Sequence, residues 1–545
     1  MRWDHSYDVV VVGSGAAGLA AALTARLRGL TALVVEKTAS YGGSSALSGG
    51  AIWVPGNLYL DGTALRDSRE DARTYLKATV GDRVPEERRE AYLERGPEMV
   101  RFLHDNTRHV RFEYTPGYAD YFPEAPGGKP LGRSVEPSLF DLRKLGSLRK
   151  TMRRAELPTY GMVMNSREFH KVNMIMRTWR GKRMALKIGL RAISSLITGA
   201  RWSSLGEALV GRLRLSLAEA GGEVWVNTPF EDLVVEDGRV VGIRAAGKNI
   251  RATGGVILAA GGFSHSQKLR EEYLPKPTDA SWTSAAPGQT GDVIGAALKA
   301  GAALDLMDRV WGMPTAVPPG EKPVFLVTDR AVPGMIVVDS RGDRFVNEAV
   351  PYHLFVDTMY AKDAVHSWMI IDQRTKNRHI MLNHFPGQPF KKAWLTSGFI
   401  KKAPTIDGLA VQMGINPEKL NATVARFNGF VDRDEDFGRG DSAYDRYYGD
   451  PTLRNPNLAP LEKGPFYAIP IVPGDIGTKG GMVTDVDARV LRADGTPIEG
   501  LYASGNVSAA VMGETYPGPG ATLGPAMTFG YVAATHIAVS PAPRA

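Results

Sequence analysis

The stretch Val9-Val10-Val11-Val12-Gly13-Ser14-Gly15-Ala16-Ala17-Gly18 decides the fold, because it joins a β-branched apolar run to the pattern G-x-G-x-x-G. A helical pattern follows, and a second apolar run, Leu33-Val34-Val35, ends at Glu36. This order is the fingerprint of a dinucleotide-binding βαβ unit. Gly13 allows the tight turn, Gly15 allows the close approach of a pyrophosphate, and Gly18 allows helix–strand packing. We expect Glu36 to accept hydrogen bonds from a ribose.

Length and composition limit the classes of protein that fit. The chain has 545 residues, which predicts two domains or more, and its 61 glycines exceed the average share of ~7%. It has no cysteine, which excludes disulfides and thiolate metal sites and fits a reducing compartment. No metal site is predicted. The N-terminus lacks a secretory signal, and outside the glycine-punctuated βα unit no run of ~20 apolar residues could span a bilayer. We therefore expect a cytoplasmic protein.

Small residues recur where later apolar runs end. The loop 41–50 is rich in glycine and serine, and it is either a flexible linker or a loop laid against the nucleotide. Its place just after Glu36 favours the second interpretation. The apolar run 255–258 ends in Ala259-Ala260-Gly261-Gly262, and the segment 498–506 near the C-terminus repeats that design. Both are expected to pass beneath the nucleotide.

The domain organisation follows from where these pieces lie. Strands are also predicted over 223–227, 230–235 and 239–244, with a hairpin turn at Asp237-Gly238. Nucleotide-binding pieces thus occur at the start, in the middle and at the end of the chain. We predict one domain formed by residues 1–278 and 465–545, with a second domain of different character, 279–464, inserted into it.

The fingerprint, the 42–50 loop, the run Ala259-Ala260-Gly261-Gly262 and the run Ala503-Ser504-Gly505-Asn506 together resemble the flavoprotein superfamily of fumarate reductase and succinate dehydrogenase. The resemblance covers nearly the whole chain. It implies that the dinucleotide is FAD and that the fold is α/β, a Rossmann-like FAD-binding domain with an inserted α+β catalytic domain. Because the chain has no cysteine, and no histidine between His5 and His104, we expect the FAD to be non-covalent.

Three short stretches of the sequence resemble the 3-ketosteroid Δ1-dehydrogenases within that superfamily. They are Asp120-Tyr121-Phe122, the run from Arg344 to Tyr352, and Thr515-Tyr516-Pro517-Gly518-Pro519-Gly520. Lys479-Gly480-Gly481 and the segment 436–441 are similar to that family as well. The resemblance implies FAD-dependent 1,2-desaturation of a 3-ketosteroid, with electrons passed to an unidentified, quinone-like or artificial acceptor.

Residue roles follow from this resemblance. Tyr516 and the backbone N–H of Gly520 would bind the steroid C3 oxygen, Tyr352 would be the general base, and Tyr121 would assist it. The residues implied to contact FAD are Gly13, Ser14, Gly15, Ala16, Ala17, Gly18, Glu36, Lys37, Gly43, Ser44, Ser45, Ser48, Gly49, Gly50, Leu233, Ala260, Gly261, Gly505, Asn506, Ala521 and Leu523.

The chemistry explains why such residues are needed. Desaturation next to a carbonyl removes a weakly acidic proton from C2 and a hydride from C1, so the developing enolate must be stabilised by donors aimed at the carbonyl oxygen. A tyrosine base has an ordinary pKa of ~10 and needs a hydrogen bond that favours its phenolate form. The chain has 19 tyrosines, and most of them are expected to be core or interface residues.

Three other functions remain open. A related enzyme could introduce a different double bond, giving a 4-ene from a 5α-3-ketosteroid. A fumarate reductase-type flavoprotein would need cations for two carboxylates, and no histidine or arginine occurs between residues 507 and 535. The third alternative is a non-catalytic steroid- or flavin-binding protein.

A basic segment spans residues 169–206, which contain no aspartate or glutamate. At ~100° per residue, Leu186, Leu190, Ile193 and Ile197 share one helix face, flanked by Arg183, Lys187 and Arg191. Such a helix suits either the surface of an anionic membrane or an ordinary surface position with its apolar face packed on its own domain. Nucleic-acid binding is not expected, because no nucleic-acid-binding motif accompanies the charge.

Overall fold

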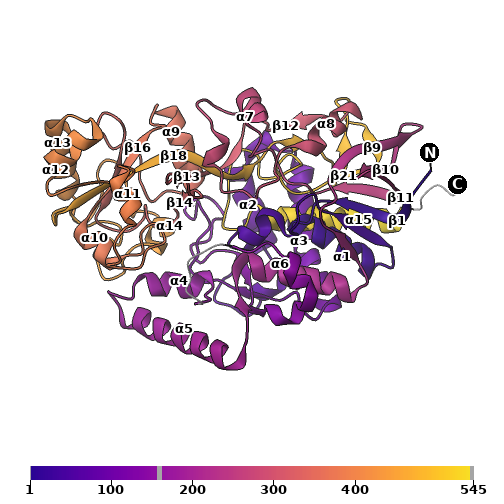
Figure 1. The fold of residues 1–545 in the computed structure, drawn as a ribbon, viewed down its shortest axis with the longest axis horizontal. Helices are drawn as coiled ribbons and strands as arrows, with labels where there is room; N and C mark the ends of the chain where they lie inside the picture. Colours follow the sequence, from indigo (N-terminus) through magenta and orange to yellow (C-terminus); the bar gives the residue numbers. More distant parts are fainter. Residues whose placement is uncertain (1, 156–161, 541–545) are drawn as a thin grey trace.

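The structure of the protein is a computed structural model that describes residues 2–155 and 162–540. Within these residues the strands form two main sheets at opposite ends of the molecule (Figure 1). The first sheet contains strands from both ends of the chain and from its middle, and the second contains strands between Val310 and Thr478. The protein is therefore a mixed α/β structure.

The first sheet has eight strands within the described residues. Parallel pairing joins β1 to both β2 and β11, β2 to β8, and β11 to β21. Antiparallel pairing adds β20 beside β21 and β10 and β9 beyond β11. The strands are β1 (His5–Val12), β2 (Ala32–Val35), β8 (Glu223–Trp225), β9 (Phe230–Glu236), β10 (Arg239–Ala245), β11 (Lys248–Leu258), β20 (Arg489–Leu491) and β21 (Pro497–Ala503).

The sequence predicted the centre of this sheet. Val9 to Val12 are buried, as expected for a strand covered on both faces. Gly13 has a positive φ of 106°, and a Cβ there would lie 2.4 Å from the Ala259 carbonyl oxygen, while a Cβ on Gly18 would lie 2.0 Å from the Gly13 carbonyl oxygen. Only glycine fits at either position, so the structural roles expected of these two glycines are confirmed.

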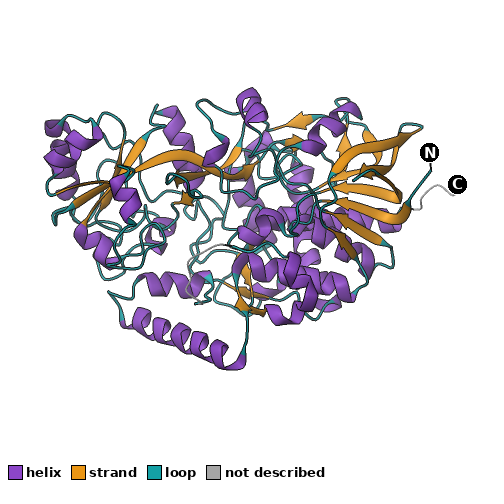
Figure 2. Ribbon diagram, in the orientation of Figure 1, coloured by secondary structure: helices purple, strands orange, loops and turns teal. Residues whose placement is uncertain are grey.

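Helices cover the lower face of this sheet in Figure 2. Helix α1 (Ala16–Leu27) packs against α15 (Leu523–Val539) and α6 (Leu205–Glu219), and α15 also packs against α3 (Glu86–Asn106). The two ends of the chain are therefore joined through α1 and α15. Other helices that precede the second sheet in the sequence are α2 (Arg69–Thr79), α7 (Gln267–Tyr273) and α8 (Asp292–Lys299).

The second sheet is antiparallel and is built around the long strand β18. Its order is β14–β13–β18–β16–β15, and β17 also pairs with β18. The strands are β13 (Val310–Ala316), β14 (Val324–Phe325), β15 (Met335–Val338), β16 (Ser367–Asp372), β17 (Lys401–Ala403) and β18 (Phe466–Thr478). Since β18 lies in this sheet, residues 466–478 do not join the first sheet, in contrast to the predicted boundary at 464/465.

Several helices surround the second sheet in Figure 1. They are α9 (Tyr352–Ala361), α10 (Gln373–Arg378), α11 (Lys392–Thr396), α12 (Ile406–Met413), α13 (Pro417–Asn428) and α14 (Ala443–Tyr447). Helix α9 packs on β13 and β18. It begins at Tyr352, so the second sheet fixes the position of the predicted base.

A helical hairpin projects below the body of the molecule in Figure 1. It consists of α4 (Ser166–Asn173) and α5 (Trp179–Thr198), which pack on each other. Helix α5 lies inside the predicted basic segment. No described helix is both long enough and apolar enough to cross a bilayer.

Short strands complete the region between the two sheets. The strands β3 (Ile52–Trp53), β4 (Phe112–Tyr114) and β5 (Ser134–Pro137) form a small sheet, and β6 (Phe140–Asp141) pairs with β7 (Trp202–Ser203). This small sheet lies under the loop that carries Tyr516, because Trp53 N donates to the Gly520 carbonyl (3.2 Å) and Ser134 Oγ donates to the Pro519 carbonyl (2.6 Å).

Candidate active site

A cavity of about 320 Å³ runs from the end of β1 to the end of β18. Its walls come from the turn after β1, the 43–51 loop, the small residues after β11 and the segment 505–526. The first and second sheets both contribute, so the cavity lies where the two halves of the molecule meet.

Most residues expected to contact the cofactor line this cavity. They are Gly13, Ser14, Gly15, Ala16, Ala17, Glu36, Lys37, Gly43, Ser44, Ser45, Ser48, Gly49, Gly50, Ala260, Gly261, Gly505, Asn506 and Leu523.

Three expected contacts lie elsewhere. Gly18 is under the turn, against Gly13. Leu233 pairs with Ile243 in the β9–β10 hairpin and packs on the core of the first sheet, and its contact with the cofactor stays a prediction. Ala521 lines a smaller neighbouring pocket.

The nucleotide end of the cavity is built around Glu36. Its carboxylate accepts hydrogen bonds from Ser14 Oγ (2.5 Å), Thr38 N (2.9 Å) and Thr38 Oγ1 (2.8 Å). Ser45 Oγ accepts a hydrogen bond from Ala16 N (2.9 Å) at the start of α1. A helix N-terminus presents free backbone N–H groups and a positive dipole end. The residues present therefore fit the pyrophosphate and ribose of a dinucleotide.

A loop that the sequence reasoning placed in the inserted domain also lines the cavity. Residues of the segment 284–293 form part of the wall. Ser44 Oγ accepts a hydrogen bond from Ala286 N (2.7 Å) and another from the Gln289 side chain, whose Oε1 accepts from Gly262 N (3.3 Å). The Pro-Gly-Gln-Thr-Gly run at 287–291 was a turn signal that could have indicated this loop.

At the other end of the cavity three predicted tyrosines converge. The ring centroids of Tyr121 and Tyr352 are 5.3 Å apart, those of Tyr121 and Tyr516 5.1 Å, and those of Tyr352 and Tyr516 5.4 Å. The Tyr121 hydroxyl donates a hydrogen bond to the Tyr352 hydroxyl. All three line the cavity together with Gly520. The geometry thus brings together four residues that are far apart in the sequence.

Burial controls the ionisation of these phenols. It raises the pKa of Tyr121 and of Tyr352 well above 10, and it raises the pKa of Tyr516. The hydrogen bond from Tyr121 opposes this effect at Tyr352. At Tyr516, hydrogen bonds with Thr522, Tyr352 and the Gly520 backbone oppose it. All three tyrosines are therefore neutral at pH 7. The hydrogen bonds to Tyr352 and Tyr516 favour the phenolate form of these two side chains.

Most backbone carbonyl groups of the loop 515–520 accept hydrogen bonds from other parts of the protein. The Pro517 carbonyl accepts hydrogen bonds from Tyr75 OH (2.6 Å) and Tyr121 N (2.9 Å). Gly520 has a φ of 92°, and a Cβ there would lie 2.3 Å from the Ala51 carbonyl oxygen. The backbone of Gly520 is therefore fixed beside Tyr516. This arrangement is needed if the Gly520 N–H and the Tyr516 hydroxyl are to donate to the same oxygen atom.

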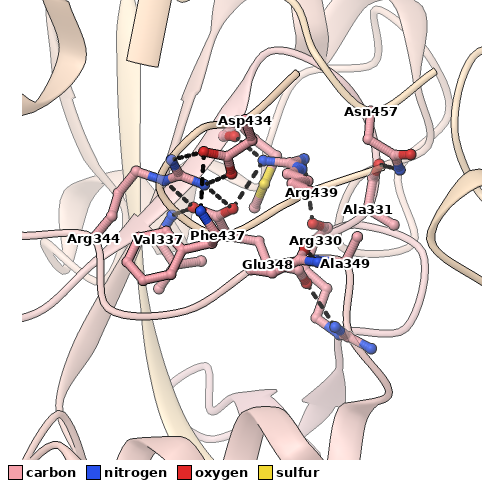
Figure 3. A network of polar contacts seen from close by, with 12 residues as sticks. Arg330, Ala331, Val337, Arg344, Glu348, Ala349, Asp434, Phe437, Arg439 and Asn457 are labelled. Atoms are coloured by element: carbon pink, nitrogen blue, oxygen red, sulfur yellow. Dashed lines mark hydrogen bonds and ion pairs between the residues drawn. The ribbon is translucent and has the colours of Figure 1, made fainter. Parts of the chain in front are cut away.

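Tyr352 is positioned by a network of buried charges, which Figure 3 shows. Glu348 accepts hydrogen bonds from Arg344 (2.8 Å) and Arg439 (3.2 Å), and Arg344 also binds Asp434 (2.7 Å). Burial acts to raise the pKa of Glu348, but the guanidinium groups of Arg344 and Arg439 outweigh it and hold the pKa below its ordinary value. The network fixes the loop 344–351, which ends at Tyr352.

Arg330 connects this loop to the tyrosine cluster. Its Nη1 donates to the carbonyl oxygens of Glu348 (2.6 Å) and Val350. Since Val350 is two residues before Tyr352, the guanidinium fixes the start of α9. Sequence reasoning identified the motif from Arg344 to Tyr352 and the segment 436–441, which contains Arg439, but no local signal indicated Arg330.

Apolar side chains form the wall around the tyrosines. Met313, Phe325, Val327 and Ile476 come from the second sheet and its connections. The charged side chains that line the cavity are Glu36, Lys37, Arg153 and Asp292. Lys37 pairs with Asp292 (2.6 Å) and Arg153 donates to Thr38 Oγ1 (2.9 Å), which places both cations at the nucleotide end. The tyrosine end therefore suits an apolar molecule that carries a carbonyl.

Comparison with known proteins adds independent evidence. The family model described as "FAD binding domain" matches residues 8–523. A 3-oxosteroid 1-dehydrogenase of Mycolicibacterium smegmatis is 48% identical over 99% of this chain and 98% of its own. The crystal structure of 3-ketosteroid Δ1-dehydrogenase from Sterolibacterium denitrificans, in complex with 1,4-androstadiene-3,17-dione, is 42% identical. It covers 98% of this chain and 100% of its own, with a TM-score of 0.93.

A more distant structure shares the fold alone. It is the 3-ketosteroid-Δ4-(5α)-dehydrogenase of Rhodococcus jostii RHA1, which is 23% identical over 99% of this chain and 98% of its own, with a TM-score of 0.69. The cavity and the tyrosine cluster agree with the family that the similarities over the full length of the chain indicate. This chain belongs to the FAD-binding-domain family and, within it, to the family of the 3-oxosteroid 1-dehydrogenases.

Proposed function

We propose that this protein is an FAD-dependent dehydrogenase that introduces the C1–C2 double bond into 3-ketosteroids. The observation that carries this proposal is the convergence of Tyr121, Tyr352, Tyr516 and Gly520 at the apolar end of a cavity whose other end fits a dinucleotide. FAD, when bound, supplies the hydride acceptor. No histidine or cysteine lines the described cavity, which supports non-covalent binding.

The residues divide the remaining chemistry among them. Tyr516 OH and Gly520 N–H donate to the C3 oxygen and stabilise the charge that develops there as the C2 proton leaves, in the manner of an oxyanion hole. Tyr352 accepts the C2 proton, and Tyr121 stabilises its phenolate form through the hydrogen bond between them. The apolar wall excludes water, so these donors act at low dielectric.

Anaerobic addition of a 4-ene-3-ketosteroid tests this function. We expect the oxidised flavin absorbance to bleach and a 1,4-diene to appear in stoichiometric amount. Retention of the oxidised spectrum with several 3-ketosteroids would contradict a dehydrogenase and favour a non-catalytic binding protein. With a 5α-3-ketosteroid we expect a 1-ene, whereas a 4-ene product would favour the alternative desaturation. Fumarate is not expected to reoxidise the reduced flavin, because the cations of the cavity lie at the nucleotide end.

The domain division is also a proposal. The first sheet, with strands from residues 5–12 to 497–503, supports a Rossmann-like FAD-binding domain formed by both ends of the chain. The second sheet supports an inserted catalytic domain that begins after about residue 278. Because β18 pairs with β13 and β16, we propose that the inserted domain ends near residue 479.

We further propose that the protein binds through α5 to the cytoplasmic surface of an anionic membrane. Leu196 is 84% exposed and Trp179 is 76% exposed. Other exposed apolar side chains of this hairpin are Met176, Leu186, Leu190, Ile193 and Ile197. If α5 packed its apolar face on its own domain, these leucines and isoleucines would be covered. Instead they face outward on an element that projects from the body.

Basic side chains flank this apolar face. Arg180, Lys182, Arg183 and Lys187 are exposed, and each contributes ~1 kcal/mol near an anionic surface. Arg191, which the sequence placed on the same flank, is instead bound by Glu168 within the hairpin (2.6 Å). An exposed apolar face between exposed cations is typical of a helix that lies in a membrane interface.

Co-sedimentation with liposomes tests this surface. The protein is expected to bind vesicles that contain phosphatidylglycerol and to bind neutral vesicles weakly. Replacement of Leu186, Leu190, Ile193 and Ile197 with serine is expected to abolish binding, whereas Val411→Ser, at a 69%-exposed apolar residue outside the hairpin, is a control expected to have no effect. Failure of the unmodified protein to bind either vesicle, or a dimer that the serine variant dissociates, would contradict the membrane proposal.

A further inference from the structure

The loop that carries Tyr516 is held from behind by a buried lysine. Lys479 follows β18, and the residue is 1% exposed. Its Nζ donates hydrogen bonds to the carbonyl oxygens of Glu514 (2.6 Å) and Thr515 (2.7 Å). Because Thr515 directly precedes Tyr516, the ammonium group fixes the peptide from which the tyrosine side chain departs.

Lys479 also reaches the Tyr516 ring through Trp311. The lysine Nζ lies 4.5 Å from the centroid of the Trp311 ring, within the range of a cation–π contact. Trp311 in turn meets Tyr516 edge to face, with 4.7 Å between the ring centroids, and its Nε1 donates to Asn506 (3.2 Å). The lysine therefore acts on both the backbone and the ring of Tyr516.

The backbone of Lys479 is itself immobile. Its N–H donates to the Arg309 carbonyl (2.9 Å), and its own carbonyl accepts from Ala510 N (3.1 Å). A Cβ on the next residue, Gly480, would lie 2.4 Å from Met307 Cα, so the chain passes here in close contact with its neighbour. The Lys479 side chain can hold another loop in place only if its own backbone is fixed.

A lysine buried at this position destabilises the fold. Burial lowers the pKa of Lys479 to about 7, although the carboxylate of Asp357 opposes this effect. Its two hydrogen-bond acceptors are neutral carbonyls, and a buried ammonium without a hydrogen-bonded carboxylate destabilises a fold relative to a well-packed apolar side chain. Packing alone therefore does not account for a lysine here.

We propose that Lys479 is a positioning residue for Tyr516, holding its phenol where it donates to the C3 oxygen of the substrate. This inference rests on the proposed function, because it assigns Lys479 a part in the stabilisation of the enolate. It predicts that Lys479 acts through the Tyr516 hydroxyl and has no separate effect on the reaction.

A double-mutant cycle tests this dependence. The readout is the rate constant of anaerobic flavin reduction by a 4-ene-3-ketosteroid. Tyr516→Phe is expected to lower it ~10²–10³-fold, as the loss of one oxyanion donor does, and Lys479→Met to lower it by about tenfold or more. In the Tyr516→Phe background Lys479→Met is expected to change the rate less than about threefold. Multiplicative effects would overturn the proposal.

An equilibrium measurement separates positioning from a general structural loss. A steroid with a phenolic A ring presents a 3-oxygen that resembles the enolate, and its binding is followed by perturbation of the flavin spectrum. Lys479→Met is expected to weaken this ligand about as much as it slows reduction, while the affinity for the 3-ketosteroid changes little. Equal weakening of both ligands would contradict a role in enolate stabilisation.

Lys376 provides a matched control. It is also a buried lysine, and its Nζ donates to the Gln388 carbonyl (2.6 Å) and lies 5.0 Å from the Phe390 ring centroid, outside the cavity. Lys376→Met is expected to lower stability and to leave the rate of flavin reduction unchanged. A loss of rate equal to that of Lys479→Met would overturn the proposal.

Two further outcomes remain informative. If Lys479→Met does not fold, Trp311→Leu removes the ring contact and leaves both hydrogen bonds of Lys479 in place, and the same cycle with Tyr516→Phe applies. A wild-type rate for Lys479→Met, with Tyr516→Phe impaired, overturns this inference and leaves the proposed function intact. If the wild-type protein is not reduced by any 3-ketosteroid, the proposed function itself fails.

Discussion

Tyr121 donates a hydrogen bond to Tyr352 across 231 positions of sequence. The two residues are held by different parts of the molecule. Tyr121 is tied through its backbone N–H to Pro517 (2.9 Å), and Tyr352 begins α9 beside the second sheet. The pair therefore forms only when both sheets are in place, and its two hydroxyls have distinguishable roles.

Removal of each hydroxyl is expected to give different losses. Tyr352→Phe should abolish flavin reduction while steroid binding persists, because the variant lacks the phenol oxygen that accepts the C2 proton. Tyr121→Phe should slow reduction by a smaller factor, since the base remains but loses its donor. Stopped-flow absorbance measures both. Tyr360→Phe, on the same helix with its hydroxyl bonded to the Pro277 carbonyl (3.0 Å), is the control. Near-normal turnover of Tyr352→Phe would remove Tyr352 as the base.

The rate of flavin reduction is expected to rise with pH. Burial raises the pKa of Tyr352 well above 10, so at pH 7 the phenol is protonated and its basic form increases ~10-fold for each pH unit. The rate constant should therefore increase from pH 7 to pH 9, but by less than ~10-fold per pH unit, because burial lowers the pKa of Lys479 to about 7 and its ammonium group loses its charge over the same range. Tyr121→Phe removes a hydrogen bond that lowers this pKa and should leave the rate below wild type throughout that range. A reduction rate independent of pH in both proteins would contradict this assignment.

Glu348→Gln is expected to destabilise the protein strongly. The glutamate is 0% exposed and is bound by Arg344 and Arg439, and breaking a buried ion pair by removing one partner costs ~3–5 kcal/mol. Urea unfolding and hydrogen exchange in residues 344–351 measure the effect. Asp436→Asn, which removes an ion pair with the 61%-exposed Arg426 side chain, should cost less than ~1 kcal/mol. Equal losses for the two variants would contradict the importance of the buried network.

Stability is expected to fall below pH 6.5. Burial lowers the pKa of His170 and of His379 to about 4, whereas unfolded histidine titrates near ~6.5. The unfolded chain therefore binds more protons than the folded protein between pH 6.5 and 4, and folding loses ~2 kcal/mol per histidine at pH 5. His170→Phe keeps the stack on Tyr447 (4.4 Å between centroids). Its free energy of unfolding should fall by ~2 kcal/mol less than that of wild type between pH 7 and pH 5.

The first half of the cofactor site could be predicted from the sequence because its determinants are local. Gly13, Gly15 and Glu36 belong to one βαβ unit, whose period and turn chemistry are visible in a short window. The Asp237-Gly238 hairpin is similar, since both residues adopt the positive φ that such a turn requires (48° and 77°). Structure at this level depends on near neighbours in sequence.

The determinants of the tyrosine end are not local. Arg330 and Lys479 act through backbone carbonyls that lie far away in sequence, and no spacing rule identifies such partners. The outward position of the α5 leucines likewise depends on what lies beside the helix, which periodicity does not reveal.

The arrangement of Tyr121, Tyr352 and Tyr516 on three separately anchored segments has a consequence for protein engineering. A chimera that exchanges one segment between relatives separates a catalytic hydroxyl from the arginines, carbonyls or lysine that hold it in place. Breakpoints between residues 121 and 516 should therefore yield folded but slow enzymes more often than enzymes with altered selectivity. Libraries that vary the apolar wall at Met313, Phe325, Val327 and Ile476 leave those supports untouched and offer the better route to new steroid preferences.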